Sequence, residues 1–317
     1  MLAFIVRRLI GAFLVLIAVS FITYLIFVQI PGGDPAQRIA GRTATDANIA
    51  DIREKLHLND PFYEQYWGMM QSLFTGSLKS YASQLDVVDQ IKQGIPATFS
   101  LCIGAGIIWL GFGILVGVIS AVTAGRLSDR VITVLALIGI SMPVFWLGLI
   151  VRYLFAQDHP FHFMPDGGYI PLTSNPWEWF VHLLMPWFVL AVLFIGFYGR
   201  VLRSNVLDTI NEDYVRTARA KGLPPRRVLV KHVLRNSLIP IVTLFGLDFA
   251  AVLGGSAILT ETVFDLKGVG YYAAQSVQSL DLPPIMGVTI YATFFIVLFS
   301  VLVDLLYAWL DPRIRPT

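Results

Sequence analysis

The stretch Asn205–Arg235, NVLDTINEDYVRTARAKGLPPRRVLVKHVLR, decides how this chain is interpreted. It is a basic loop between two apolar runs, Val181–Val201 and Leu238–Leu259, each long enough to cross a bilayer. The loop contains a short helix with start and stop signals of its own. A helix carried on a loop at the membrane face is typical of an element to which another protein binds. The stretch therefore indicates a subunit that is driven from outside itself.

This loop helix is predicted over residues 211–222. Asn211 is the expected N-cap, and the acidic residues after it place negative charge on the positive end of the helix. Basic residues fill the last turn, and Gly222 supplies a left-handed stop. A helix of about three turns is marginal alone in water, so the face shared by Tyr214, Val215 and Ala218 needs a cover.

A second helix is expected from about Pro225, with Arg227, Lys231 and Arg235 in an i, i+4 row. That row could reach lipid headgroups or face an acidic partner. From the residues alone, an amphipathic segment lying on the lipid surface fits as well as a docking element. Nucleic acid is not indicated, since membrane topology and anionic lipid already account for the basic charge.

The rest of the chain is an all-α, polytopic membrane protein by composition, with 56% hydrophobic and 14% charged residues in 317 positions. Six runs are long enough to span a bilayer. They are Leu9–Ile30, Pro96–Thr123, Val131–Ala156, Val181–Val201, Leu238–Leu259 and Ile285–Leu310. The first is interpreted as a retained helix because its apolar stretch is longer than that of a secretory signal. The single Cys102 rules out an intramolecular disulfide.

The charge is distributed unevenly along the chain. With the amino terminus inside, the inner segments hold 15 of the 23 basic residues, whereas the loops 157–180 and 260–284 hold only Lys267. The positive-inside rule therefore predicts that both termini and the basic loop are cytoplasmic.

Three regions are expected: 1–30, the amino-terminal segment with the first span; 31–95, an extracytoplasmic helical insertion; and 96–317, the transmembrane core of five helices with the cytoplasmic loop 202–237. The insertion should hold helices that start at Thr45, at Asp60–Pro61 and near Ser83. It could be a structural lid or a docking surface, and both remain open.

Glycine and proline mark close packing and kinks inside the spans. Gly113 and Gly117 are one helical turn apart, a spacing that lets membrane helices approach closely. Pro143 should kink the third span, and Gly254–Ser256 should loosen the end of the fifth.

A few polar and aromatic residues are candidates for function or anchoring. Asp248 lies midway along the fifth span and, with Ser141 beside the proline kink, is a candidate for the substrate path, although an internal hydrogen bond suits Asp248 better. Arg152 should snorkel towards the membrane surface. Trp177, Trp179 and Trp187 are interpreted as an interfacial belt.

No site for a metal or for catalysis is predicted. His159 and His162 lie near Asp158, but the proline between the histidines spoils their presentation on a helix. The sequence contains no nucleophile elbow and no paired acid and base, so a membrane enzyme is disfavoured.

The run Arg216–Gly222, RTARAKG, resembles the cytoplasmic signature Glu-Ala-Ala-x-x-x-Gly of binding-protein-dependent ABC importer permeases. Arg216 and Thr217 replace its first two letters, and the closing Ile239–Pro240 comes later than usual. With these departures, the run resembles the version of the signature found in the dipeptide, oligopeptide and nickel branch of the family. The order of further motifs extends the resemblance over nearly the whole chain. They are Arg7–Arg8, Pro31–Pro35, Asp60–Tyr66, Ile95–Thr98, Ser141–Trp146, Glu261–Phe264, Gly268–Gly270, Asp304–Tyr307 and Leu310–Arg313.

The resemblance implies a permease subunit of an importer for peptides or related small solutes in a prokaryotic inner membrane. Its loop helix would be a coupling helix that docks on a cytoplasmic ATPase. The residues expected to make that contact are Glu212, Asp213, Tyr214, Val215, Arg216, Thr217, Ala218, Arg219, Lys221 and Gly222.

The implied partners are two ATPase subunits, a second permease and an extracytoplasmic substrate-binding protein. This chain is expected to bind no cofactor, because it has no phosphate-binding loop; ATP and magnesium would be used by the ATPases. The alternative is a proton-coupled secondary transporter that uses Asp248 and Asp304 as a relay, with Asp304 otherwise expected to cap or pair with Arg313.

Overall fold

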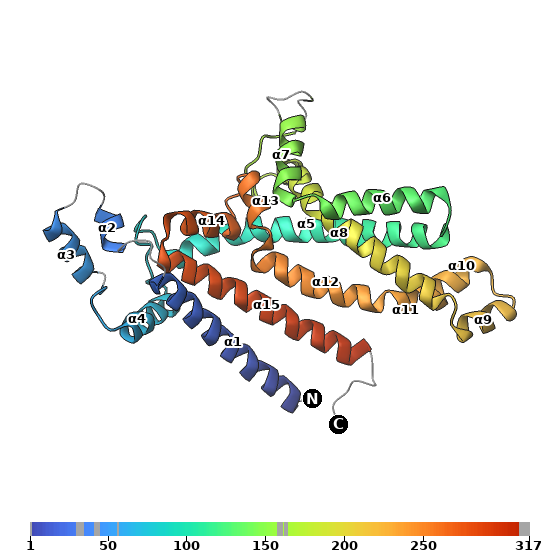
Figure 1. Ribbon diagram of the computed structural model, residues 1–317, viewed down its shortest axis with the longest axis horizontal. Coiled ribbons are helices and arrows are strands. Elements are labelled where there is room, and N and C mark those ends of the chain that lie inside the picture. The colour runs from blue at the N-terminus through green and yellow to red at the C-terminus, as the bar shows by residue number, and fades with distance from the viewer. Residues whose placement is uncertain are drawn as a thin grey trace.

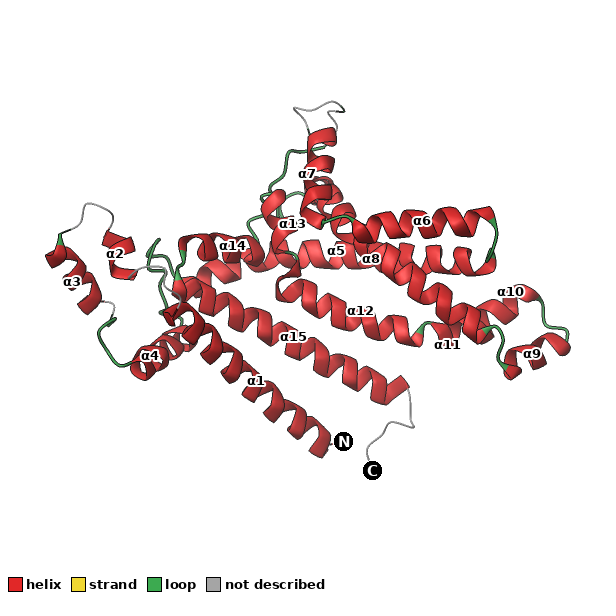
Figure 2. Ribbon diagram, viewed as in Figure 1, coloured by secondary structure: helices red, strands yellow, loops and turns green. Residues whose placement is uncertain are grey.

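The computed structural model describes residues 2–29, 35–40, 45–55, 57–156, 161 and 164–310. Every regular element in these residues is a helix, joined by loops (Figure 2). Five helices are long and apolar enough to cross a membrane. They are α1 (Leu2–Gln29), α5 (Val87–Val122), α8 (Pro176–Thr209), α12 (Ile239–Ala251) with its continuation η2 (Val252–Ser256), and α15 (Leu282–Leu310). The predicted all-α polytopic fold is confirmed.

The third predicted span is broken rather than straight. It consists of α6 (Leu127–Ser141) and α7 (Val144–Phe155), which meet at an angle of 101°. Met142 and Pro143 between them are extended, with ψ of 127° and 131°. Proline lacks the N–H that a helix requires and disfavours helical backbone in the residue before it. The predicted kink at Pro143 is therefore confirmed, and the pair counts as a sixth span only if the bent unit crosses the bilayer.

The core of the bundle is the crossing of α5 with α8, and α6 packs on α8 beside it. A Cβ atom on Gly113 would lie 2.8 Å from Cβ of Tyr198, and one on Gly117 would lie 2.8 Å from Cβ of Leu202. At such distances any side chain at these two positions would force the helices or their side chains to shift. The predicted role of the Gly113–Gly117 spacing in close helix packing is confirmed.

The insertion after α1 contains α2 (Pro35–Ala40), α3 (Asp46–Lys55) and α4 (Phe62–Thr75). The hydroxyl of Thr45 accepts a hydrogen bond from the Asn48 amide at 3.4 Å, and Gly76 ends α4 with a φ of 73°. The expected third helix near Ser83 does not form separately. Asp86 caps α5, which starts at Val87 and continues through Pro96 into the membrane span.

The insertion is attached to the bundle by polar contacts. The carboxylate of Asp281, just before α15, accepts hydrogen bonds from the Ser80 hydroxyl and from the amides of Tyr81 and Ala82. The hydroxyls of Ser20 in α1 and Tyr66 in α4 are 2.7 Å apart. These contacts fix the insertion at one end of the long helices.

The opposite end of the bundle carries the short helices that follow α8. The first turn of α1 and the last turn of α15 also point towards that end (Figure 1). The start of α1, the end of α15 and the predicted coupling loop therefore lie on the same side of the bundle, away from α2–α4.

We predict that Gly113→Ala destabilises the protein, because its methyl group overlaps with Tyr198. Overpacking of this kind costs about 1–3 kcal/mol. The matched control is Gly111→Ala on the same helix, where nothing lies within 4 Å of the new atom. In thermal unfolding in detergent, Gly113→Ala should melt several degrees lower and Gly111→Ala no lower than the parent. Equal melting temperatures would contradict the close crossing.

Candidate functional site: the loop between α8 and α12

The loop after α8 is built from four short helical elements. They are α9 (Asp213–Ala220), α10 (Pro225–Arg227), the π-helix η1 (Val228–Leu234) and α11 (Arg235–Ser237). In Figure 1, α9 and α10 lie beyond the far ends of the long helices, and α11 leads back into α12. The loop helix predicted from the sequence therefore exists, although it is shorter than the predicted range 211–222.

The start of α9 differs from the prediction, whereas its end matches. Asn211 is not the N-cap: its side-chain amide donates to the Leu207 carbonyl at 3.0 Å, and Glu212 occupies the cap position without a side-chain capping bond. Because Asn211 is still within reach of the last turn of α8, it caps that helix end instead. Gly222 has a φ of 77°, and its amide donates to the Arg219 carbonyl at 2.9 Å, as expected for a left-handed stop.

The apolar face of α9 is covered by the chain itself. Val215 and Ala218 are buried in one cluster with Val228 and Val233 of η1, against which α9 packs. Tyr214 is 41% exposed, and its hydroxyl accepts a hydrogen bond from the Asn236 amide at 2.7 Å. An amphipathic helix that lies on lipid inserts its apolar face into the headgroup region. Since α9 uses that face internally, the lipid-surface interpretation loses its physical basis for this helix.

The remaining face of α9 is charged and exposed. Arg216 pairs with Asp213 at 3.6 Å, but the two side chains are 68% and 98% exposed, so the pair contributes little to stability. Exposed residues on this side are Glu212, Asp213, Arg216, Thr217, Arg219, Lys221 and Gly222. These groups are available to a partner.

The second half of the loop departs from a regular α-helix. Residues 228–234 form a π-helix, in which each bond reaches five residues along the chain. Arg227, Lys231 and Arg235 are all exposed, and their alignment in one i, i+4 row stays a prediction.

The base of the loop is attached to α8 by a buried hydroxyl. Ser237 is 2% exposed, and its hydroxyl is 3.0 Å from Oγ1 of Thr209 and 3.2 Å from the Asn205 carbonyl. The Asn205 amide returns a bond of 3.4 Å to the Ser237 carbonyl. These bonds join α11, which leads into α12, to the end of α8.

A buried ion pair connects α8 to its other neighbours at the same end. The guanidinium of Arg203 donates to both oxygens of Asp129, each at 2.8 Å. Asp129 is 4% exposed and also accepts from the Ser120 hydroxyl and from the Gly125 amide. This bidentate contact joins α8 to the turn between α5 and α6. The positive-inside count included Arg203 but did not reveal its partner.

Two of the membrane-facing predictions change in the structure. Arg152 has protein partners that the prediction did not include: it binds both oxygens of Asp166, at 3.1 and 3.0 Å, and donates to the Val263 carbonyl. Trp187 is 5% exposed and donates to the Ser100 carbonyl at 2.9 Å, so it is a core residue rather than part of a belt. Both side chains found polar partners far away in sequence, which composition alone does not reveal.

The substrate-path candidates have separate surroundings. Asp248 accepts a hydrogen bond of 2.7 Å from the Tyr198 hydroxyl, the internal partner that suited it best. Ser141 is exposed at the end of α6. Their role in a substrate path stays a prediction. The side chain of Asp304, as well as Arg313, Asp158, His159 and His162, lies outside the described residues.

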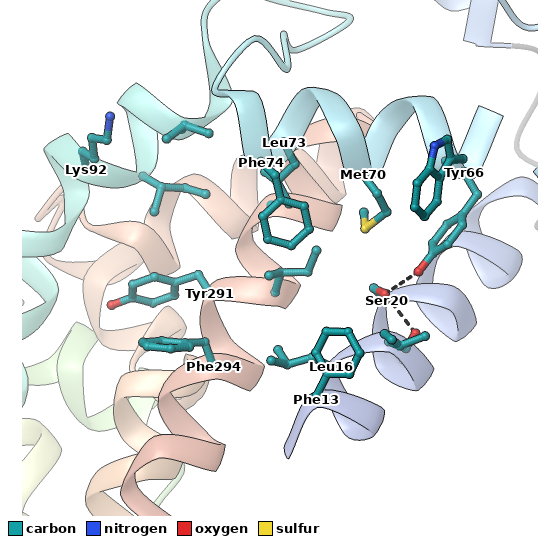
Figure 3. A pocket seen from close by; sticks show the side chains of 16 residues that line it. Phe13, Leu16, Ser20, Tyr66, Met70, Leu73, Phe74, Lys92, Tyr291 and Phe294 are labelled. Atoms are coloured by element: carbon teal, nitrogen blue, oxygen red, sulfur yellow. Dashed lines mark hydrogen bonds between the residues drawn. The ribbon is translucent and has the colours of Figure 1, made fainter. Parts of the chain in front are cut away.

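Two of the cavities beside the spans have mostly apolar walls. One, of about 640 Å³, lies between α1, α4 and α15 and is lined by Phe13, Met70 and Phe294 among others (Figure 3). The hydroxyls of Ser20 and Tyr66 at its edge bond to each other, as the dashed line in Figure 3 marks. They therefore offer no free polar group to a charged cargo.

A buried carboxyl joins three elements at the end opposite α9. Glu261, in α13 (Ile258–Val263), accepts from the Thr98 hydroxyl of α5 at 2.7 Å and from the Tyr271 amide at 2.8 Å. Tyr271 belongs to α14 (Val269–Ser279), whose first amide donates to Thr98 at 2.9 Å. Burial raises the pKa of Glu261 from 4.5 to about 7. The motifs that contain Thr98 and Glu261 were recognised in the sequence, but their contact was not.

We predict that the Glu261 carboxyl makes stability fall as the pH rises. Between the unfolded pKa of 4.5 and the folded value of about 7, the native state holds a proton that the unfolded state has lost. Raising the pH through this window therefore removes up to about 3 kcal/mol of stabilisation. Melting temperatures at about pH 5 and about pH 8 should differ more for the parent than for Glu261→Gln.

The control for this pH experiment is Glu178→Gln, the same chemical change at an exposed glutamate. It should keep the pH dependence of the parent. An unchanged pH dependence in Glu261→Gln would show that this carboxyl does not titrate in the stated window.

Comparisons with known proteins agree with this architecture. Residues 113–316 match the family model described as binding-protein-dependent transport system inner membrane component, and residues 1–102 match the model for the amino-terminal part of such membrane components.

Curated relatives align over nearly their whole length. The probable D,D-dipeptide transport system permease protein DdpB of Escherichia coli K12 is 38% identical, covering 97% of this chain and 96% of that protein. The dipeptide transport system permease protein DppB of Alkalihalophilus pseudofirmus is 37% identical over 99% of this chain and 100% of the relative. The di/tripeptide transport system permease protein DppB of Pseudomonas aeruginosa is 36% identical over 99% of each.

Among solved structures, the MetNI methionine ABC transporter in inward-facing conformations matches with a TM-score of 0.53 at 17% identity. The match covers 71% of this chain and 97% of that one. At this identity the likeness concerns the fold alone.

Proposed function

This chain belongs to the family of binding-protein-dependent transport system inner membrane components, and we propose that it is the permease subunit of an ATP-driven importer for short peptides. The observation that carries the proposal is the state of α9. Its apolar face is covered by η1, its charged face is exposed, and its base is attached to two spans. This is the arrangement expected of a helix that a partner protein binds and displaces.

The proposed partners are two ATPase subunits at the α9 end, a second permease beside the spans, and an extracytoplasmic binding protein at the other end. ATP and magnesium would act in the ATPases, and this chain would carry out translocation without catalysis. The α9 end, together with both chain termini, would be cytoplasmic, which agrees with the positive-inside count.

In this mechanism, closure of the ATPases on ATP displaces α9, and the Ser237 contact passes the displacement to α8 and α12. The spans would then alternate between states open to either side. ATP can bias that equilibrium only through contacts that differ between the two states. The exposed charges of α9 are the groups that can supply such contacts.

Short peptides are the proposed cargo because three relatives aligned over nearly the full chain carry names that specify dipeptide or di/tripeptide transport. Selection among peptides would rest largely on the binding protein.

The function is tested by reconstituting the complete complex in proteoliposomes and following uptake of a labelled dipeptide. Uptake should require ATP, the ATPases and the binding protein together. Uptake through this chain alone, driven by a proton gradient, would establish a secondary transporter instead.

We predict that the double substitution Arg216→Glu with Arg219→Glu lowers ATP-driven uptake at least about tenfold, because it reverses two charges on the proposed contact surface. Both side chains are exposed, so membrane insertion and melting temperature should stay as in the parent. Binding of the ATPases is measured by co-purification from membranes.

The matched control is Arg226→Glu, an exposed arginine in the same loop but outside α9. It should keep most of the uptake. Full uptake in the double variant would mean that α9 is not the contact through which the ATPases drive transport.

A further inference from the structure

A polar cavity of about 690 Å³ lies at the end of the bundle opposite α9. Its walls come from the first turns of α5, from residues 168–169, from the turn between α13 and α14, and from α14 itself. Most of its lining side chains are amide, phenol or charged groups, whereas most of those around the cavity in Figure 3 are apolar. Those that the argument uses are Gln93, Tyr169, Asp265, Lys267 and Gln275.

The two charged residues of this cavity have an unusual backbone. Asp265 and Lys267 have φ values of 50° and 52°, in the left-handed region that side-chain-bearing residues rarely adopt. Leu266 between them is completely buried, and its amide donates to the Glu261 carbonyl at 3.0 Å. Strain of this kind persists only where the surroundings impose it, and it clusters at functional sites. In this turn the left-handed backbone positions Asp265 and Lys267 on either side of Leu266, which is held by its burial and its hydrogen bond.

Both charges are available to a ligand. In the part of the chain that the structure describes, neither Asp265 nor Lys267 has an ion-pair partner within 4 Å. Arg152 is a cation near enough to interact electrostatically with Asp265. It does not form an ion pair with Asp265, because its guanidinium binds both oxygens of Asp166.

The polar cavity continues into an apolar groove. Gln93 and Tyr169 line both spaces, and the groove, of about 1020 Å³, follows α5 and α8 past Ile103 and Trp187. A space with opposite charges at its mouth and apolar walls beyond matches a ligand with a charged main chain and variable side chains. Two residues of extended chain span at most about 7 Å, so the backbone positions of Asp265 and Lys267 are separated by no more than the length of a dipeptide.

We propose that this cavity is a cargo-binding vestibule for the zwitterionic main chain of a short peptide, with Asp265 facing the peptide ammonium group and Lys267 the peptide carboxylate. The adjoining groove takes the peptide's apolar side chains. The proposal rests on the proposed peptide-import function and adds a binding site within this chain.

The test uses the complete complex in lipid nanodiscs with the reporter substitution Gln275→Cys on the exposed wall of the cavity. The native Cys102 is buried and does not compete for a water-soluble maleimide. The rate of modification is measured on this subunit by mass spectrometry against increasing concentrations of alanylalanine. The dipeptide should slow modification, and its acetylated and amidated form should not.

The charges are tested by Asp265→Asn and Lys267→Gly, because asparagine and glycine tolerate left-handed backbone. Each should raise the half-protecting concentration of alanylalanine at least about fivefold, since a charge-assisted hydrogen bond to the ligand is lost. The modification rate without peptide should not change. Matched controls are Asp89→Asn and Lys92→Gln, an exposed acid and base on α5 that lie outside this cavity; they should leave the half-protecting concentration unchanged.

Equal protection by the blocked peptide, or an unchanged half-protecting concentration in both charge variants, would overturn the vestibule. ATP-driven dipeptide uptake by the parent complex would persist in that case, so the proposed function would stand. If the parent complex takes up no peptide with all its partners and ATP, the proposed function fails and the vestibule fails with it.

Discussion

The close crossing of α5 and α8 is the contact on which the rest of the structure depends. Because Gly113 and Gly117 have no side chains, the backbones of the two helices approach until any Cβ would overlap with Tyr198 or Leu202. The two helices together reach both ends of the molecule. α8 carries the proposed coupling loop at one end, and α5 presents Thr98 and Gln93 at the other. A rigid pair of this kind gives the loop and the vestibule a common frame, since association in lipid relies on close van der Waals packing.

Features set by local sequence were predictable. Apolar run length located the long helices, and the missing N–H of proline located the break after Met142. Gly222 ends the loop helix with positive φ, as a residue without a Cβ atom can. Each of these features depends on a few neighbouring residues, so the pattern alone suffices.

Features set by distant partners were not predictable. Thr98 and Glu261 are 163 positions apart, and the sequence indicates neither that they meet nor that the carboxyl is buried. The same holds for Arg152 with Asp166 and for Trp187 with Ser100, where an interfacial role was the better guess from composition. The loop helix and a second helix from about Pro225 were located from local signals, but the π-helical form of η1 was not, because a π-helix leaves no clear periodic pattern. The outcome at Asn211 shows the same limit, since a side chain near two helix ends can cap either.

The breaks in helical structure avoid the α5–α8 pair. One separates α6 from α7, and the other is η2, where Gly255 has a φ of 138° between α12 and α13. Hinges are a few residues that absorb large changes in φ and ψ, often at the ends of elements. α13, which follows the second break, carries Glu261, and the next turn holds the strained Asp265 and Lys267. A movement at Gly255 would therefore displace the vestibule wall against the fixed α5, and the Thr98–Glu261 hydrogen bond lies directly across that boundary. The Thr98–Glu261 hydrogen bond resists such a movement together with the Val269–Thr98 hydrogen bond, so the loss of these two contacts would report the movement.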